Sequence, residues 1–278
     1  MSSFKKIVKR LTQWIVFSSL HISIAAMWWG VITLILLDAP FNFSLIIIFL
    51  LPFFVYTFNR LGIEKGDKIN YPERVKFALK YRRIFLVLAA LGYIFAISLY
   101  LSFNLIVIIL TFLPLVSYVV YRFGKKYLLV KNIIIAIVWA CAVLLAASSI
   151  GILNETVFCF FIFVFLRDFI NSIFFDIRDV KGDEMTKIKT LPVVIGVDKT
   201  LKILSILNII SGVLLIFFVL LRFLPKFAIT LIGLLFYDMF YYYLYRRKNI
   251  DKFILFDLIA DSEIYFAALL IFIGRLWL

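Results

Sequence analysis

The chain has 278 residues, of which 65% are hydrophobic and 17% are charged, and its formal net charge at pH 7 is +14. This composition, with a mean hydropathy of +1.09, excludes a water-soluble globular protein, because no soluble fold needs so much apolar surface. Apolar runs of membrane-spanning length recur from end to end. We therefore expect a single integral-membrane domain over residues 1–278, in contact with the lipid bilayer.

Taken in chain order, the apolar runs predict an all-α fold, a polytopic bundle of nine transmembrane helices. The predicted helices are residues 11–37, 43–58, 84–101, 103–121, 128–150, 157–175, 201–221, 227–245 and 253–277. The first run is too long and too rich in tryptophan to be a cleaved signal peptide. Cys141 and Cys159 both lie inside apolar runs, which indicates buried packing residues rather than a disulfide or a metal pair.

The distribution of Lys and Arg predicts the orientation of these helices. In the nine-helix arrangement, 27 of the 30 basic residues fall on the side of the N-terminus, and only Arg222, Lys226 and Arg275 fall on the other. By the positive-inside rule we expect the N-terminus in the cytoplasm. The expected location is the cell membrane of a prokaryote, with the longer polar loops and any site that they form facing the cytoplasm. Anionic lipid then accounts for the net charge, so nucleic acid is not expected as a partner.

The loop after the second predicted helix is long, polar and rich in charges of both signs. Its polar residues include Asn59, Arg60, Glu64, Asp67, Asn70, Glu73 and Arg74. The loop lies on the expected cytoplasmic side, where it can meet other loops across the mouth of a helical bundle.

A second acidic segment follows the sixth predicted helix, on the same side. Asp176, Asp179 and Asp183 stand three and four residues apart, and Glu184 follows directly. On a helix this spacing puts the first three carboxylates on one face. Such a face, with room for water and phosphate oxygens, suits Mg²⁺. A solvated acidic loop is the alternative, but it does not explain why two such segments fall on one side.

The second segment resembles the UbiA family of intramembrane prenyltransferases. Asp179-Val-Lys-Gly-Asp183 is similar to the family's DxxxD motif, and the following KTLPVVIG, from Lys189 to Gly196, is similar to its usual continuation. Lys187 departs from the pattern, because a glycine is common there.

The loop after the second helix resembles the other motif of that family. Asn59 matches its start, and Asp67 to Arg74, DKINYPER, match its end. Arg60 and Ile63 stand where the family has carboxylates, and Glu64 is displaced by one position. The spacing from Asn59 through Ile63 to Asp67 is nearer to NxxxG/AxxxD, the form found in the family's terpene-cyclase branch.

The resemblance implies a bundle around a central cavity in which Mg²⁺ binds the diphosphate of an isoprenoid substrate. Charge builds on that leaving group as the allylic C–O bond breaks, and divalent cations and Arg or Lys neutralise it. The implied metal ligands are Asn59, Glu64, Asp67, Asp176, Asp179 and Asp183, of which Asn59, Asp67, Asp179 and Asp183 are the implied catalytic residues. The expected diphosphate contacts are Arg60, Arg74, Arg178 and Lys189.

Three functions remain open on the sequence. The first is transfer of the isoprenoid from a prenyl diphosphate to a lipophilic or aromatic acceptor. The second is cyclisation of the prenyl diphosphate by a UbiA-type terpene cyclase. The third is a membrane transporter or scaffold without catalysis, which the lack of a convincing internal repeat does not favour. The acceptor and the prenyl chain length are not predicted.

Several ionisable residues inside the predicted helices are further candidates for a functional role. Asp238, Asp257, Asp261 and Glu263 lie in the last two helices, where they either serve the site or pair with Arg246, Arg247 or Lys252. Arg167 and Asp168 are expected to form a structural ion pair. His21, the single histidine, is expected to be a packing residue, since no carboxylate lies beside it at helical spacing.

Overall fold

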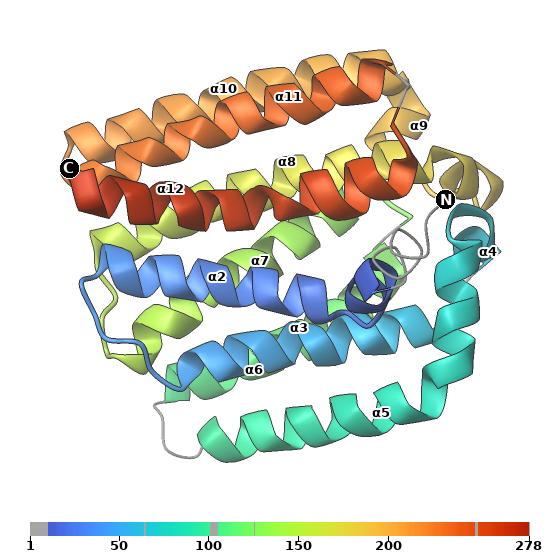
Figure 1. Cartoon of the computed structure of the whole chain (residues 1–278), viewed down its shortest axis with the longest axis horizontal. Helices are drawn as coiled ribbons and strands as arrows, with labels where there is room; N and C mark the ends of the chain where they lie inside the picture. The colour runs from blue at the N-terminus through green and yellow to red at the C-terminus, as the bar shows by residue number, and fades with distance from the viewer. Residues whose placement is uncertain (1–10, 64, 101–104, 125, 248–249, 278) are drawn as a thin grey trace.

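The computed structural model of the chain is a bundle whose long helices run in nearly the same direction (Figure 1). The structure describes residues 11–63, 65–100, 105–124, 126–247 and 250–277. Within these residues the regular structure is helical and there is no strand, so the predicted all-α class is confirmed.

The helices of the first half cover the predicted apolar runs, but the stretch predicted as a polar loop after the second run is helical too, as α4 and the start of α5. They are a short helix over 11–17, then α2 (Leu20–Leu36), α3 (Ser44–Leu61), α4 (Lys65–Asn70), α5 (Pro72–Tyr100), α6 (Leu105–Gly124) and α7 (Val130–Ser149). The first helix meets α2 at an angle of 65°. Ser19 adopts a left-handed backbone conformation, with φ of 69°, at this bend, and that conformation interrupts the helix.

The second half contains the longest helix of the fold. Its elements are α8 (Glu155–Met185), α9 (Leu191–Ile195), α10 (Val197–Leu220), a 3₁₀ segment (Lys226–Ile232), α11 (Gly233–Arg247) and α12 (Glu263–Trp277). Helix α8 has 31 residues, and its side chains are buried on one face from Val157 to Asp183. It carries the second acidic segment as a continuous extension of a spanning helix.

The number of membrane-spanning helices differs from the predicted nine. Within the described residues, six helices are long and apolar enough to cross a membrane, and the bent N-terminal pair makes seven if it is one span. Nine spanning helices are therefore not confirmed. The last predicted helix is not one α-helix, because a π-helical segment (Phe253–Ile259) and a 3₁₀ turn (Ala260–Ser262) precede α12.

Side chains from two neighbouring helices bind the backbone where the last helix is irregular. The Tyr237 hydroxyl of α11 donates to the carbonyl of Ile259 at 2.8 Å, and Asn171 Nδ2 of α8 donates to the carbonyl of Ala260 at 3.2 Å. These hydrogen bonds tie the irregular segment to α8 and α11.

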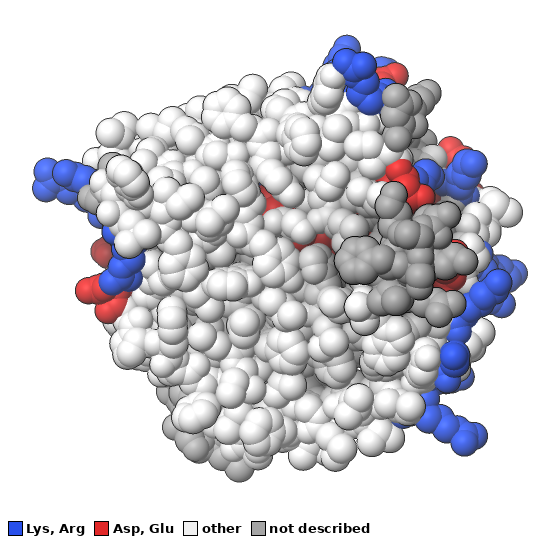
Figure 2. Space-filling view, in the orientation of Figure 1, with Lys and Arg blue, Asp and Glu red and all other residues white. Residues whose placement is uncertain are grey.

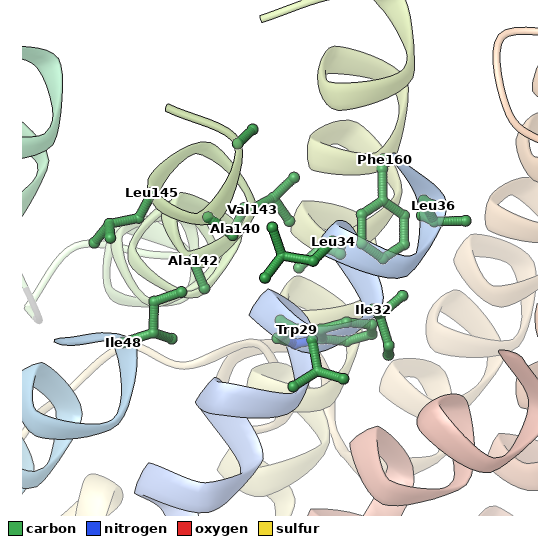
Figure 3. Close-up of a cluster of buried hydrophobic side chains, with 14 of the residues drawn as sticks. Trp29, Ile32, Leu34, Leu36, Ile48, Ala140, Ala142, Val143, Leu145 and Phe160 are labelled. Carbon is green, nitrogen blue, oxygen red and sulfur yellow. The ribbon is translucent and has the colours of Figure 1, made fainter. Parts of the chain in front are cut away.

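The core lies where α2, α3, α7 and α8 meet (Figure 3). Trp29 of α2 is fully buried and packs edge-on against Phe160 of α8, with 5.9 Å between ring centroids. Helix α7 presents small side chains such as Ala140 and Ala146 to this core, and both are fully buried. Small residues let the helix backbones approach closely, which is how helices associate when lipid surrounds them.

The outer surface is apolar around the middle of the molecule and charged at its two ends (Figure 2). Large apolar side chains are exposed on α5, α6 and α10, for example Ile94 at 62%, Ile109 at 60% and Val213 at 60%. Such a belt between two charged ends fits a protein surrounded by lipid.

Candidate active site

A polar cavity of about 270 Å³ lies among α2, α3, α4, α7, α8 and the irregular segment before α12. It brings together predicted site residues that are far apart in the sequence: Asn59, Arg60, Asp67, Arg74, Asp176, Arg178, Asp179 and Asp183. Two predicted residues are not among them. Lys189 is exposed and does not line the cavity, whereas its neighbour Ile188 does. Glu64 lies outside the described residues.

The two polar segments meet where α4 packs against the end of α8. Asn70 Nδ2 donates to the backbone carbonyl of Asp179 at 3.2 Å. This approach requires Gly182, because a Cβ atom there would lie 2.3 Å from Asn70 Nδ2. The lack of a side chain at Gly182 in the second motif thus allows the first motif to pack against the second.

Tyr71 links the first segment to Asp179. Its hydroxyl donates a short hydrogen bond to the Asp179 carboxylate. The guanidinium groups of Arg74 and Arg178 lie 3.7 and 4.6 Å from the centre of the Tyr71 ring. Burial raises the pKa of the Tyr71 phenol well above its usual value, so Tyr71 remains a hydrogen-bond donor. Sequence reasoning missed this residue, although it stands inside the DKINYPER stretch.

The two predicted arginines are held in defined positions. Arg178 Nη1 lies 2.8 Å from Asp257 Oδ1, and its Nε lies 3.3 Å from Asp179 Oδ1. Its guanidinium also stacks on Phe175, 4.5 Å from the ring centre. Arg74 Nη2 lies 3.4 Å from Asp67 Oδ1. Each arginine keeps further donors, since a guanidinium carries five.

Arg60 also lines the cavity, from the end of α3. Its Nη1 donates to the carbonyl of Val16 at 2.5 Å, so the bent N-terminal helix fixes its position. The positive charge that replaces a motif carboxylate therefore faces the same cavity as Arg74 and Arg178.

Lys131, at the start of α7, binds two carboxylates of the second segment. Its Nζ lies 2.7 Å from Asp176 Oδ1 and 3.5 Å from Asp183 Oδ2. Asn132 Nδ2 also donates to Asp176, at 3.0 Å. Asp176 is only 3% exposed, and these contacts favour Lys131 over a metal ion as its partner. In the sequence, Lys131 is a lysine at the start of an apolar run, and it counts among the basic residues of the preceding loop.

The remaining carboxylates can hold Mg²⁺ only together with water and the phosphate oxygens of a bound substrate. Among the described residues, no three Asp, Glu, His or Cys side chains are close enough to bind a metal ion together. Asp67, Asp179 and Asp183 nevertheless face one cavity from two elements. Mg²⁺ is usually bound through one or two carboxylates, water and substrate phosphates rather than by a closed protein cage. The donor set fits that mode of binding.

The expected ion pair between Arg167 and Asp168 is wrong. Arg167 Nη2 lies 2.6 Å from Asp238 and 2.5 Å from Glu263, and its Nη1 donates to Asn208 at 2.6 Å. Neighbouring residues on a helix point in different directions, so Arg167 reaches α10, α11 and α12 instead. Asp238 and Glu263 are therefore bound by Arg167, not by the basic residues of the loop before the last helix.

Asp168 faces the inner end of the cavity. It is 8% exposed, and its Oδ2 makes no hydrogen bond. The indole of Trp29 faces this carboxylate, but Trp29 Nε1 also lacks a hydrogen-bond partner of ordinary geometry. Since Arg167 is fully engaged elsewhere, Asp168 has no counter-charge in direct contact among the described residues.

The opposite wall of the cavity is aromatic. Tyr56 of α3 and Trp139 of α7 line it, and Trp139 Nε1 donates to the Tyr56 hydroxyl at 3.0 Å. The same two residues line a second, apolar cavity of about 50 Å³ among α2, α3, α6 and α7. The polar cavity therefore adjoins apolar space on the side away from α8.

His21 does not line the cavity. Its ring stacks on Tyr265 with 5.2 Å between centroids, and the Tyr265 hydroxyl donates to the His21 carbonyl at 2.9 Å. These contacts fit the packing role expected for this histidine.

Comparison with known proteins places this architecture among prenyltransferases. Residues 19–256 match the model of the UbiA prenyltransferase family. Over 201 residues the chain is 31% identical to a digeranylgeranylglyceryl phosphate synthase from Sulfurisphaera tokodaii, a match that covers 66% of each chain. It is also 31% identical to a synthase of the same name from Methanosphaera stadtmanae, over 53% of this chain and 55% of that one. The matches thus span less than two thirds of either relative.

Solved structures of low sequence identity share the fold. A structure from work on digeranylgeranylglyceryl phosphate synthase in membranes has a TM-score of 0.65 at 19% identity, over 97% of this chain and 100% of that one. A UbiA homologue from Archaeoglobus fulgidus bound to DMAPP and Mg²⁺ has a TM-score of 0.61 at 16% identity, over 96% of both chains. The likeness extends over nearly the whole bundle.

Proposed function

The chain belongs to the UbiA prenyltransferase family, and from that membership we propose that it is a Mg²⁺-dependent intramembrane enzyme that transfers an isoprenoid from a prenyl diphosphate to a lipophilic or aromatic acceptor. The observation that carries this proposal is the convergence of Arg60, Arg74 and Arg178 with Asp67 and Asp179 in one cavity. Positively charged side chains and carboxylates from both motifs line a cavity that suits a diphosphate.

The arginines supply the contacts to the diphosphate in this proposal. Arg matches phosphate geometry with parallel N–H donors, and Arg74 and Arg178 are already oriented by the Tyr71 ring between them. Arg60, held by the Val16 carbonyl, adds a third positive charge. Fixed donors of this kind act where charge develops without having to reorganise during the reaction.

Asp67, Asp179 and Asp183, with Asn59, would hold Mg²⁺ between the protein and the diphosphate. Bound there, the metal ion supplies charge neutralisation for the leaving group as the allylic C–O bond breaks. Tyr71 orients the Asp179 carboxylate by donating to it, and Lys131 holds Asp183 from the other side. The homologue bound to DMAPP and Mg²⁺ supports this assignment at the level of the fold.

The aromatic wall would hold the isoprenoid chain. Tyr56 and Trp139 lie on the side of the cavity that adjoins the apolar space, and Trp29 lines the cavity from α2. Aromatic faces in a dry site stabilise a developing allylic cation without trapping it. For the acceptor, the names of the relatives make a prenylated glyceryl phosphate the first compound to test.

A terpene cyclase is the second candidate, and Asp168 is the observation that favours it. This unpaired carboxylate stands 11 residues before Asp179 on α8, which corresponds to roughly 16 Å along the helix axis. A carboxylate at that depth could face a cation formed far along a folded isoprenoid chain. With Ile63 in place of a motif carboxylate, the first motif is nearer to the form of the cyclase branch than to that of the transferases.

The experiment that separates these functions uses purified protein with farnesyl and geranylgeranyl diphosphate. Products are identified by mass spectrometry with and without quinone precursors or geranylgeranylglyceryl phosphate. A transferase forms a prenylated acceptor and is slow without one. A cyclised hydrocarbon or alcohol formed without acceptor would establish the cyclase instead, and no product with any substrate would exclude both enzymes.

A further inference from the structure

The carboxylates that line the cavity from the last helix differ in how they are bound. Glu263 is held by Arg167, and Asp257 is held by Arg178 at 2.8 Å. Asp261 lines the same cavity but makes no hydrogen bond or ion pair with any described residue. It is therefore the carboxylate of this helix that remains available to a ligand.

The position of Asp261 follows from its neighbours. It stands four residues after Asp257, about one turn further along the irregular segment. Asn171 of α8 donates to the carbonyl of Ala260 at 3.2 Å and so fixes the backbone beside Asp261. If Arg178 binds the diphosphate, Asp261 lies one turn deeper, where the allylic carbon and the incoming nucleophile must be.

The irregular helix before α12 places three carboxylates on the cavity wall. Asp257, Asp261 and Glu263 all line the cavity, although residues six apart in a regular α-helix point in different directions. The π-helical turns and the 3₁₀ turn before α12 bring them to one wall. Insertions of π-helix into helices are frequent at functional sites.

We propose that Asp261 is the general base of the transfer reaction and that the acceptor reacts through a hydroxyl group. This inference rests on the proposed prenyltransferase function. The acceptor oxygen forms a bond to C1 of the prenyl group while the bond from C1 to the diphosphate oxygen breaks. The hydroxyl proton passes to the Asp261 carboxylate, and diphosphate leaves with the electron pair of the broken bond.

Asp168 does not fit this role. It stands ten residues before Arg178 on α8, which is about 15 Å along the helix axis. An attacking oxygen must lie about 3–3.5 Å from the reacting carbon, so its base must be close to the diphosphate end of the cavity. Asp261 meets this condition and Asp168 does not.

The test compares Asp261→Asn and Asp261→Glu with the wild type, using geranylgeranyl diphosphate and geranylgeranylglyceryl phosphate as donor and acceptor. Asp261→Asn should lower the transfer rate by about 10²–10⁴-fold, the usual contribution of a general base, and leave the Kd for geranylgeranyl diphosphate unchanged. Asp261→Glu should restore part of the rate. Asp198→Asn, on the exposed start of α10, is the matched control and should behave as wild type.

An acceptor analogue with a thiol in place of the hydroxyl separates a base from a structural residue. A thiol loses its proton more readily than an alcohol, so Asp261→Asn should lose much less rate with the thiol. Equal losses with both acceptors, or a wild-type rate with the hydroxyl, would overturn the assignment. Mg²⁺-dependent turnover that accepts no hydroxyl compound would overturn this inference but leave the prenyltransferase intact. No diphosphate release from any prenyl diphosphate would instead refute the proposed function.

Discussion

At the scale of single residues, Arg167 neutralises two carboxylates in the interior of the bundle. Asp238 is fully buried and Glu263 is 3% exposed, and both depend on the one guanidinium. A buried charge that loses its partner is strongly destabilising, because neither water nor another charge replaces it. This network explains how two acids are tolerated at membrane depth.

We therefore predict that Arg167→Met destabilises the protein by about 3–5 kcal/mol, since it leaves both carboxylates without a counter-charge. The measurement is unfolding of the purified protein in detergent micelles on addition of denaturing detergent. Arg275→Met is the matched control, because Arg275 pairs with Asp38 on the exposed surface. Such a pair contributes about 0–1 kcal/mol, so an equal effect of the two substitutions would refute the role given to Arg167.

Part of the site could be predicted from residue types and spacing, and part could not. The Asp179–Asp183 spacing and the DKINYPER stretch predict two polar segments that meet, and the structure brings them into one cavity. Lys131 could not be found in this way, because a lysine at the start of an apolar run has the same appearance whether it faces lipid headgroups or a buried carboxylate. The partners of Arg167, Asp238 and Glu263, follow from how α8 packs against α11 and α12, and the residue spacing within α8 carries no information on that packing.

At the scale of elements, the contact between α4 and α8 aligns the two motifs. We predict that Gly182→Ala lowers kcat/KM for the prenyl diphosphate by about fivefold. The added Cβ displaces Asn70 and breaks its hydrogen bond to the Asp179 carbonyl, worth roughly 1 kcal/mol. Steady-state kinetics with the purified protein measure this effect.

Gly66→Ala is the control for that substitution, on the other side of the same contact. Its nearest neighbour would be the Gly182 carbonyl oxygen at 3.7 Å, an ordinary contact distance. The variant should retain wild-type kinetics. Loss of activity in Gly66→Ala alone, with Gly182→Ala unaffected, would show that the contact does not align the site.

The apolar runs predict where the helices lie but not where they bend. Each predicted range is occupied by helical structure within the described residues, because a long apolar run in lipid must satisfy its own backbone hydrogen bonds. The bend at Ser19 and the irregular segment before α12 do not follow from apolar periodicity. The second depends on hydrogen bonds from Tyr237 and Asn171, which are distant in the sequence.

At the scale of the whole molecule, the two charged ends differ in composition. We predict that the end with α4 faces the cytoplasm and that the C-terminal end of α12 faces outside, because the predicted topology puts most of the basic residues at the first end. Single cysteines at Asn42 and Lys65, in a variant that lacks the native cysteines, test this by labelling from outside intact cells. Labelling at Asn42 alone is expected, and labelling at Lys65 alone would reverse the orientation.

The central claim is that the cavity ionises a prenyl diphosphate with Mg²⁺ held by the carboxylates of both motifs. The most direct measurement is diphosphate release from geranylgeranyl diphosphate by wild type, Asp179→Ala and Asp183→Ala, with acceptor present and with Mg²⁺ or a chelator. We predict release by the wild type that the chelator abolishes, and no release above background by either variant, although both remain folded. Release that is independent of Mg²⁺, or that both variants retain at the wild-type rate, would contradict the account.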